Sequence, residues 1–148
     1  MGDTARDSFM QQPMYQQTQT HQPIQTTGQP MEQRFQDVAT PQQLDASDAI
    51  AHAVQVCEWC AFQCVQLGDR EMAECIQLCE DVSELGETAL SLIPRQSRFT
   101  QQHLQTLQGA LQACAQECSR HHHAHCQECA QVLPDAVQTI QQFNDTFQ

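Results

Sequence analysis

The feature that most constrains this sequence is the spacing of its nine cysteines, which fall into four groups along the chain. Within each group, successive cysteines are three or four residues apart, the repeat that places side chains on one face of an α-helix. The groups are Cys57, Cys60 and Cys64; Cys75 and Cys79; Cys114 and Cys118; and Cys126 and Cys129. The spacing predicts an all-α fold of four helices, each with a row of sulfur atoms along one side.

The overall charge excludes one large class of partner. The chain of 148 residues has a formal net charge of -12, and its six basic residues are all arginines. Because phosphate binding needs clustered Lys or Arg, we expect no nucleic acid partner.

Hydropathy and cysteine usage indicate the cellular location of the chain. No stretch approaches the roughly 18 apolar residues that span a membrane, and the N-terminus has no apolar core of a signal peptide. We therefore expect no membrane insertion and a cytoplasmic location. A reducing cytoplasm keeps thiols available for metals, and an odd number of cysteines does not suit a fully paired disulfide framework.

The sequence divides into a tail and a bundle. Residues 1–40 are rich in Gln, Thr and Pro, which predicts a disordered tail with a short helical turn around residues 35–39. An ordinary flexible tail is favoured over a role in copper delivery, for which the candidate ligands are Met10, Met14, His21 and Met31. Residues 41–148 are expected to form an antiparallel up-down four-helix bundle that binds metal.

Capping residues and helix breakers set the expected boundaries of the first two helices. The first begins either at the Thr40 capping box or at Ser47, and it ends before Gly68, which suits a left-handed C-terminal cap. The second begins at Asp69 and ends near Leu92, because Pro94 cannot continue it.

The last two helices are predicted in the same way. The third begins at Ser97 and ends near Arg120. The fourth covers residues 121–147, with either a kink near Val132 and Leu133 or a restart at Pro134, since an internal proline costs about 3 kcal/mol. Short connections make sequential helices antiparallel.

Antiparallel order places all four cysteine groups at the same end of the bundle, the end that carries the His121–His125 connection. The other half is expected to be an ordinary apolar core of Ile50, Val54, Leu85, Leu90, Leu104, Leu107, Val137 and Ile140. One end of the bundle is thus predicted to bind metal, and the other to stabilise the fold.

The chemistry of thiolates favours Cu(I) at this end. Thiolates select Cu(I), zinc or iron–sulfur clusters over hard cations. Cu(I) accepts two or three thiolates that can be shared between ions, whereas a single zinc takes four ligands in a tetrahedron. The candidate metal ligands are Cys57, Cys60, Cys64, Cys75, Cys79, Cys114, Cys118, Cys126, Cys129, His121 and His125. The histidines could capture an incoming ion, although a solvated polar loop explains them equally well, and Met72 fits core packing better than ligation.

Several other interpretations stay open. The cysteines could be small buried hydrophobes of a structural or interaction bundle, or the ligands of an iron–sulfur electron carrier or a zinc site. Thiol–disulfide exchange at the two C-x-x-C pairs is disfavoured, because that chemistry needs a βαβ context. We find no paired carboxylates, activated nucleophile or phosphate-binding loop, so we do not expect an enzyme.

Residues 48–145 resemble the cysteine-rich four-helix bundle copper-binding proteins, the copper storage protein family. The matching stretches are CEWCAFQC (57–64), EMAECIQLC (71–79), ACAQECSRHHHAHCQECA (113–130) and Ser97-x-Phe99. The resemblance implies a four-helix bundle that stores Cu(I) on cysteines projecting into its core and that can assemble as a homo-oligomer, with copper ions as its partner.

The sequence departs from the family in one half of the bundle. Family members usually continue the cysteine pattern along all four helices, but here the corresponding positions are Ile50, Ala53, Val82, Gly86, Leu104, Leu107, Leu111, Leu133 and Ala136. We therefore expect a smaller copper capacity and a protein that buffers, stores or detoxifies copper, with sensing or delivery more plausible than in a full store.

Overall fold

A computed structural model describes residues 32–147 of the chain. Its elements are α1 (Phe35–Val38), α2 (Pro41–Leu67), α3 (Ala73–Leu92), α4 (Thr100–Ser119) and α5 (Ala124–Asn144), with 3-10 turns at Arg70–Met72 and Asp145–Phe147. Helix α1 occupies the helical turn predicted around residues 35–39. The rest of the predicted disordered tail, with the candidate copper ligands Met10, Met14, His21 and Met31, lies outside the described residues.

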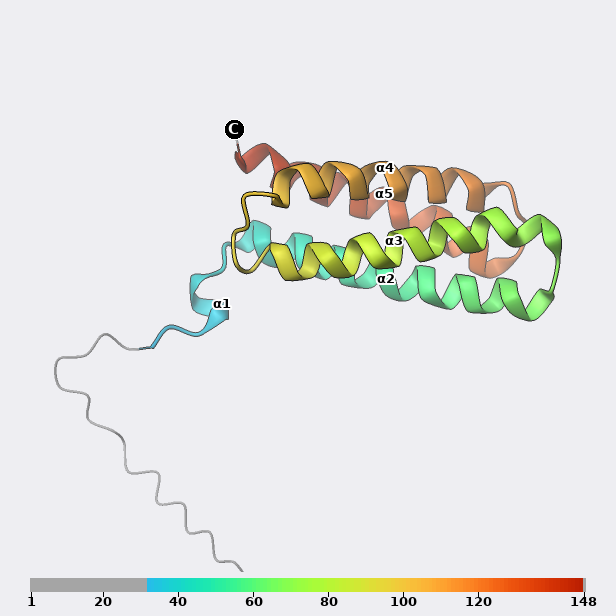
Figure 1. The fold of residues 1–148 in the computed structure, drawn as a ribbon, viewed down its shortest axis with the longest axis horizontal. Helices are drawn as coiled ribbons and strands as arrows, with labels where there is room; N and C mark the ends of the chain where they lie inside the picture. Colours follow the sequence, from blue (N-terminus) through green and yellow to red (C-terminus); the bar gives the residue numbers. More distant parts are fainter. Residues whose placement is uncertain (1–31, 148) are drawn as a thin grey trace, which may run out of the picture. The chain divides into compact units, whose positions relative to one another are not determined.

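The four long helices form a closed bundle. Helix α2 packs on α3, α3 on α4, α4 on α5, and α5 on α2. Short connections at alternating ends make each helix antiparallel to the next (Figure 1). This arrangement confirms the predicted all-α, antiparallel bundle. Within residues 32–147, no helix is both long enough and apolar enough to cross a membrane.

The first of the two candidate starts of α2 is the one used. The Thr40 hydroxyl accepts a hydrogen bond from the Gln43 backbone N–H at 3.1 Å, and the Gln43 side chain accepts one from the Thr40 N–H at 2.9 Å. This reciprocal capping box satisfies two backbone donors that the first helical turn leaves free. Helix α2 ends at Leu67 because Gly68 takes the left-handed conformation, with φ 65°.

The starts of α3 and α4 differ from the predictions in detail. Asp69 accepts a hydrogen bond from the Glu71 N–H at 3.0 Å, but it caps the 3-10 turn that leads into α3. Ser97 accepts one from the Phe99 N–H at 3.2 Å, yet α4 begins only at Thr100. The intervening residues form the reversal between α3 and α4, in which Gln96 has a left-handed φ of 51°.

Helix α5 corrects two predictions. It begins at Ala124 instead of residue 121, because His121–His123 are needed to turn the chain back from α4. It also runs through Pro134 without a break, so of the two predicted alternatives, a kink near Val132 and Leu133 or a restart at Pro134, the restart was wrong. The proline ring lies on the exposed face and the next buried positions, Leu133 and Ala136, keep their packing. Burial of these side chains offsets the hydrogen bond that Pro134 cannot donate.

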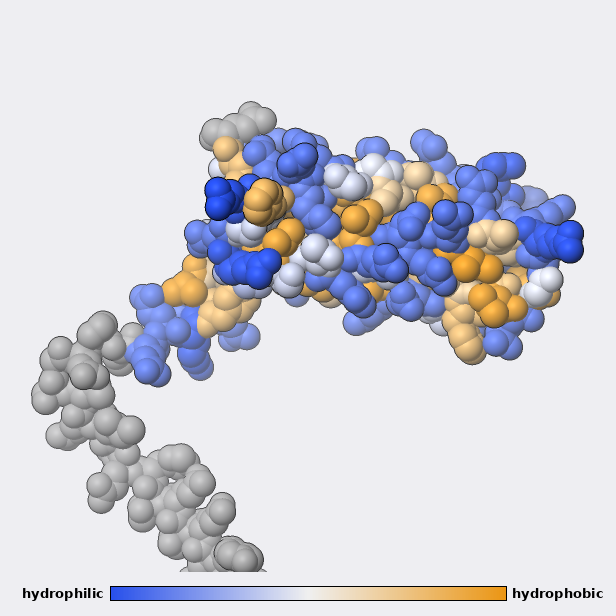
Figure 2. All heavy atoms as spheres, in the orientation of Figure 1, coloured by the Kyte–Doolittle hydropathy of each residue, from blue (hydrophilic) through white to orange (hydrophobic). Residues whose placement is uncertain are grey.

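The bundle interior has two chemically different halves. All nine cysteines are fully buried toward the α2–α3 and α4–α5 connections. In the other half, Ile50, Leu104, Leu107 and Ile140 are buried, and Val54, Leu85, Leu90 and Val137 are partly buried against them, as predicted. The face in Figure 2 is largely hydrophilic, with separate apolar patches. The fold therefore encloses the sulfur atoms and holds them away from solvent.

Candidate metal centre

The sulfur atoms of neighbouring helices are in direct contact. The Cys75 and Cys118 Sγ atoms lie 3.5 Å apart, and those of Cys79 and Cys114 lie 3.6 Å apart, so two pairs join α3 to α4. The Cys60 Sγ of α2 lies 3.9 Å from that of Cys75. Thiols at these distances can bind a common metal ion with small side-chain rotations.

The helix register arranges the interior in layers. One turn separates Cys75 from Cys79 on α3 and Cys118 from Cys114 on α4, so the two contacting pairs belong to successive layers. Continuing along both helices, the same register places Val82 opposite Leu111. Counting in the same way along α2 and α5 gives the layers: Cys60, Cys75, Cys118 and Cys126, with Cys64 one turn farther along α2; then Cys57, Cys79, Cys114 and Cys129; then Ala53, Val82, Leu111 and Leu133. The change from sulfur to aliphatic carbon therefore occurs between two adjacent layers.

Three groups of sulfur atoms have the proximity that a metal ion needs. Within each group, every Sγ lies within 4.8 Å of the others. The groups are Cys60, Cys75, Cys79 and Cys118; Cys60, Cys64, Cys75 and Cys126; and Cys57, Cys79 and Cys129. Cys60, Cys75 and Cys79 each belong to two groups. The groups therefore form one contiguous set of sulfurs, in which shared thiolates can bridge ions.

Cys114 completes this set from α4. Its Sγ lies 3.6 Å from that of Cys79 and 3.9 Å from that of Cys118. The structure thus brings all nine predicted cysteine ligands together. Met72, buried beside them, fills the core as expected from its type.

Burial also controls the protonation of the thiols. Desolvation raises the pKa of Cys64 from its ordinary value of 9.0 to about 11, and it raises the pKa of Cys126 as well. By contrast, the hydrogen bond with the Cys118 thiol lowers the pKa of Cys75. Cys64 and Cys126 are therefore protonated near neutral pH, and a metal ion must displace their protons when it binds.

His125 and His121 lie outside the three sulfur groups. His125 is buried, and within the described part of the chain its Nε2 has no hydrogen-bond partner. Its ring stacks on His123 at 5.3 Å between centroids and meets the Trp59 ring edge-on at 6.2 Å. Burial lowers the pKa of His125, with a smaller contribution from His123, so the imidazole is held neutral and able to bind a metal.

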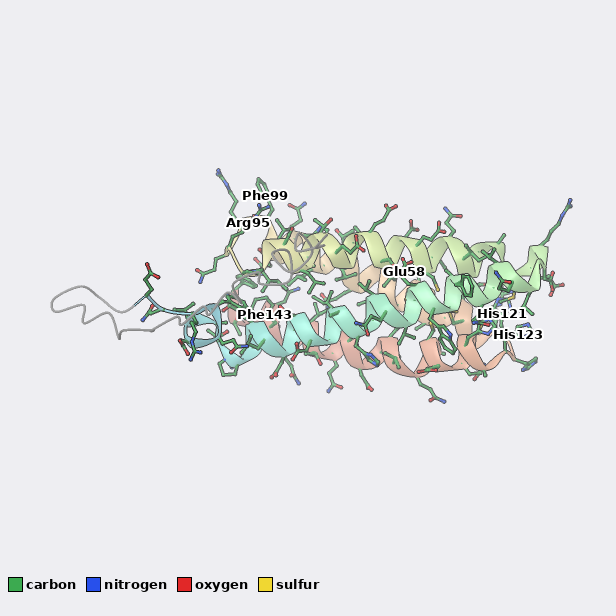
Figure 3. The ribbon with its side chains drawn as sticks, turned by 90° about the horizontal axis from the view of Figure 1, so that it is seen from below. Glu58, Arg95, Phe99, His121, His123 and Phe143 are labelled. Carbon is green, nitrogen blue, oxygen red and sulfur yellow. The ribbon has the colours of Figure 1, made fainter. Side chains whose placement is uncertain are left out.

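His121 has a different environment, at the same end of the bundle. Figure 3 shows His121 and His123 at the end opposite Arg95, Phe99 and Phe143. The His121 Nε2 lies 2.9 Å from Oε1 of Glu117, a buried carboxylate of α4. Sequence reasoning missed Glu117, although its spacing of four residues from His121 is the signal for a contact on one helix face.

The family model for copper storage proteins matches residues 40–144. The chain belongs to the copper storage protein family. This assignment confirms the resemblance seen in the sequence. The copper storage proteins are a non-enzymatic family that stores metal ions. Among curated relatives, this copper storage protein is 25% identical over 86 residues to the uncharacterized cysteine-rich protein YhjQ of Bacillus subtilis (strain 168), covering 57% of the chain and 80% of that relative.

Solved structures of similar fold agree with this assignment. The Cu(I)-bound copper storage protein BsCsp3 superposes with a TM-score of 0.65 at 20% identity, covering 69% of this copper storage protein and 97% of that chain. The copper storage protein Ccsp of Streptomyces lividans, loaded with 10 copper equivalents, superposes with a TM-score of 0.67 at 22% identity, covering 77% and 92% respectively. These similarities show that the four-helix fold is shared.

Proposed function

We propose that this copper storage protein holds Cu(I) on the thiolates of its nine cysteines, in the sulfur-lined half of the bundle only. The observation that carries the proposal is the contiguous set of buried sulfurs, with three thiols shared between groups. Such a site buffers, stores or detoxifies copper in the reducing cytoplasm, where the thiols remain unoxidised.

The shared thiols favour Cu(I) over the other soft-metal interpretations. One zinc ion fits the group of Cys60, Cys75, Cys79 and Cys118, but a second zinc in the neighbouring group would have to share two of those ligands. An iron–sulfur cluster must fit its own irons and sulfides between the cysteines, and sulfurs already in contact leave little room for them. Low-coordinate Cu(I) with bridging thiolates uses every sulfur.

The number of sulfur layers also limits the copper capacity. If every thiolate bridges two ions, nine thiolates hold about six ions when each ion binds three sulfurs, and about nine when each binds two. The aliphatic layers that begin at Val82 and Leu111 add no ligands. We therefore propose a capacity of about six to nine Cu(I) ions per chain.

The histidines extend the proposed site at its solvent-facing end. His125 offers a buried Nε2 without a partner among residues 32–147, and His121 lies at the end of α4 beside Cys118. We propose that these imidazoles bind incoming copper and pass it to the thiolates. Substituting both should slow loading while leaving the final number of bound ions nearly unchanged.

The exposed surface of α2 favours self-association of the chain into a homo-oligomer. Phe62 and Val65 are 58% and 57% exposed, and Trp59 is 41% exposed, so an apolar stripe faces solvent near the sulfur-lined end. We propose that this stripe contacts a second copy of the chain. Sedimentation of Phe62→Ser should show a lower mass than the parent protein; equal masses would contradict this assembly.

The function is tested by anaerobic titration of reduced full-length protein with Cu(I) against a competing chelator, with zinc in parallel. Saturation at six to nine equivalents, with thiolate-to-copper absorption, is expected. Tight binding of a single zinc without a preference for copper would refute the proposal. Reconstitution with iron and sulfide tests the electron-carrier alternative, for which visible absorption and a paramagnetic signal on reduction are required.

A further inference from the structure

The reversal between α4 and α5 contains a buried carboxylate with a defined pair of partners. The Glu117 side chain is only 8% exposed. Its Oε1 lies 2.9 Å from Nε2 of His121, and its Oε2 accepts a hydrogen bond from Nη1 of Arg120 at 3.2 Å. Each carboxylate oxygen therefore has a separate partner.

The carboxylate fixes which ring nitrogen of His121 carries the proton. An ionised carboxylate only accepts hydrogen bonds, so Nε2 must be the donor. In the neutral imidazole the lone pair is then on Nδ1. Histidines that bind metals commonly donate their other N–H to a carboxylate, which sets the ring orientation and increases the basicity of the ligating nitrogen.

The backbone of His121 is held as firmly as its ring. Its N–H donates to the Cys118 carbonyl at 3.1 Å, and its own carbonyl accepts a hydrogen bond from the Gln127 side chain at 2.6 Å. These contacts tie the residue to both α4 and α5, next to cysteines of the first sulfur layer. His121 is therefore kept at a constant position relative to Cys118.

The surroundings of Glu117 and His121 favour a cation. A pocket of about 400 Å³ opens there, lined by Glu71, Glu74, Glu117, Arg120 and His121. Its three carboxylates outnumber the single guanidinium of Arg120, and together with the partial negative charge at the C-terminal end of α4 they attract a positive ion. His125, in contrast, lies against Trp59 and His123 and is not among the residues that line this pocket.

We infer that Glu117 is a positioning residue for copper loading: it holds His121 with Nδ1 free, so that this atom receives Cu(I) from the acidic pocket before the thiolates do. The inference rests on the proposed function, because it assigns the route by which the stored ion reaches the sulfurs. On this route, His121 binds the incoming copper ion before His125 does, and Glu117 does not contact copper.

The chain offers a matched control for this role. Glu128 precedes Cys129 as Glu117 precedes Cys118, but Glu128 is exposed. Glu117→Ala should slow uptake from a Cu(I)–bicinchoninate complex about tenfold, the size of effect typical for residues that orient metal ligands. Glu128→Ala should leave the rate unchanged. Glu117→Gln, whose amide oxygen can still accept from Nε2, should restore most of it.

A double variant separates positioning from general stability. Combined with His121→Ala, the Glu117→Ala substitution should slow uptake no further, because Glu117 acts through His121. Additional slowing in the double variant, or an unchanged rate in Glu117→Ala, would overturn the inference. If Glu117→Ala does not fold, Glu117→Met keeps the side-chain volume and has the same expected rate.

Nitrogen-detected NMR of the copper-free protein gives a second readout. His121 should be the Nε2-protonated tautomer in the parent protein and in Glu117→Gln, and a mixture of tautomers in Glu117→Ala. An Nδ1-protonated ring in the parent protein would overturn the inference whether or not copper binds. Failure of the parent protein to bind Cu(I), with the expected tautomer present, would instead refute the proposed function.

Discussion

Adding one cysteine next to the existing sulfur layers tests whether the copper capacity depends on thiols that adjoin one another. Leu111 is fully buried on α4, one turn before Cys114, in the layer that follows Cys79 and Cys114. A cysteine there adds a tenth thiolate adjoining the existing set. We expect Leu111→Cys to bind about one more Cu(I) ion, since each bridging thiolate contributes about one ion at most.

The cost of this change to the metal-free protein follows from burial. Replacing a fully buried leucine by cysteine removes about two methyl or methylene groups, at about 0.8 kcal/mol each, plus a small cavity. The variant should therefore be about 2 kcal/mol less stable, which lowers Tm by about 6 to 10 °C for a unit of this size. Bound Cu(I) should recover this loss, because it binds the folded state.

The matched control is Leu104→Cys, which changes another fully buried leucine on the same face of α4, two turns farther from the sulfurs. Its Tm should fall by a similar amount, but its thiol has no neighbouring ligand. Anaerobic titration with a Cu(I) chelator and calorimetry measure both effects. If Leu104→Cys gains as much copper as Leu111→Cys, or Leu111→Cys gains none, contiguity does not determine capacity.

Three further predictions follow from the site and its packing. Cys79→Ser should lose about one Cu(I) equivalent and Cys64→Ser less than one, because Cys79 serves two sulfur groups and Cys64 only one; copper titration compares them. The metal-free protein should lose stability as pH rises from about 9 toward 11, because the unfolded chain releases a proton that buried Cys64 retains. It should also lose stability below about pH 6.5, because the unfolded chain binds a proton that buried His125 does not. Denaturant unfolding at a series of pH values measures both losses. Gly86→Ala should destabilise the bundle by about 1 to 2 kcal/mol, because the new Cβ would lie 2.5 Å from Cγ2 of Val54.

Each of these predictions has its own control. Cys79→Ser should fold, because a serine there can donate to the carbonyl one turn earlier, as Ser83 does to Cys79 at 3.0 Å. Stability that increases steadily from pH 9 to 11 would contradict the burial of protonated thiols. Gly109 has open space around its Cβ position, so Gly109→Ala should stabilise α4 by up to about 1 kcal/mol. Equal effects at the two glycines would refute the close approach of α2 and α3.

Local sequence patterns were sufficient for most of the fold. The cysteine period, the Thr40 capping box and Gly68 depend only on residues within a few positions of one another, so the end of α2 was predictable and its start was limited to two caps, Thr40 and Ser47. The connections were predicted less well: α4 and α5 begin three residues later than expected, because reversal of the chain direction uses residues that have good helical patterns. The continuity of α5 through Pro134 depends on packing that no local pattern reveals.

The sequence by itself determined the soft-metal chemistry and the end of the bundle at which it lies, since helix period and antiparallel order both follow from local spacing. The resemblance to the copper storage protein family then identified the positions at which other residues replace cysteines. Only the tertiary structure decided which sulfurs share a layer, that Cys60, Cys75 and Cys79 join the groups into one set, and that Glu117 orients His121 while His125 is buried with a free Nε2 among residues 32–147. These contacts depend on helix rotation and register to within a few ångströms, which residue spacing along one chain cannot specify.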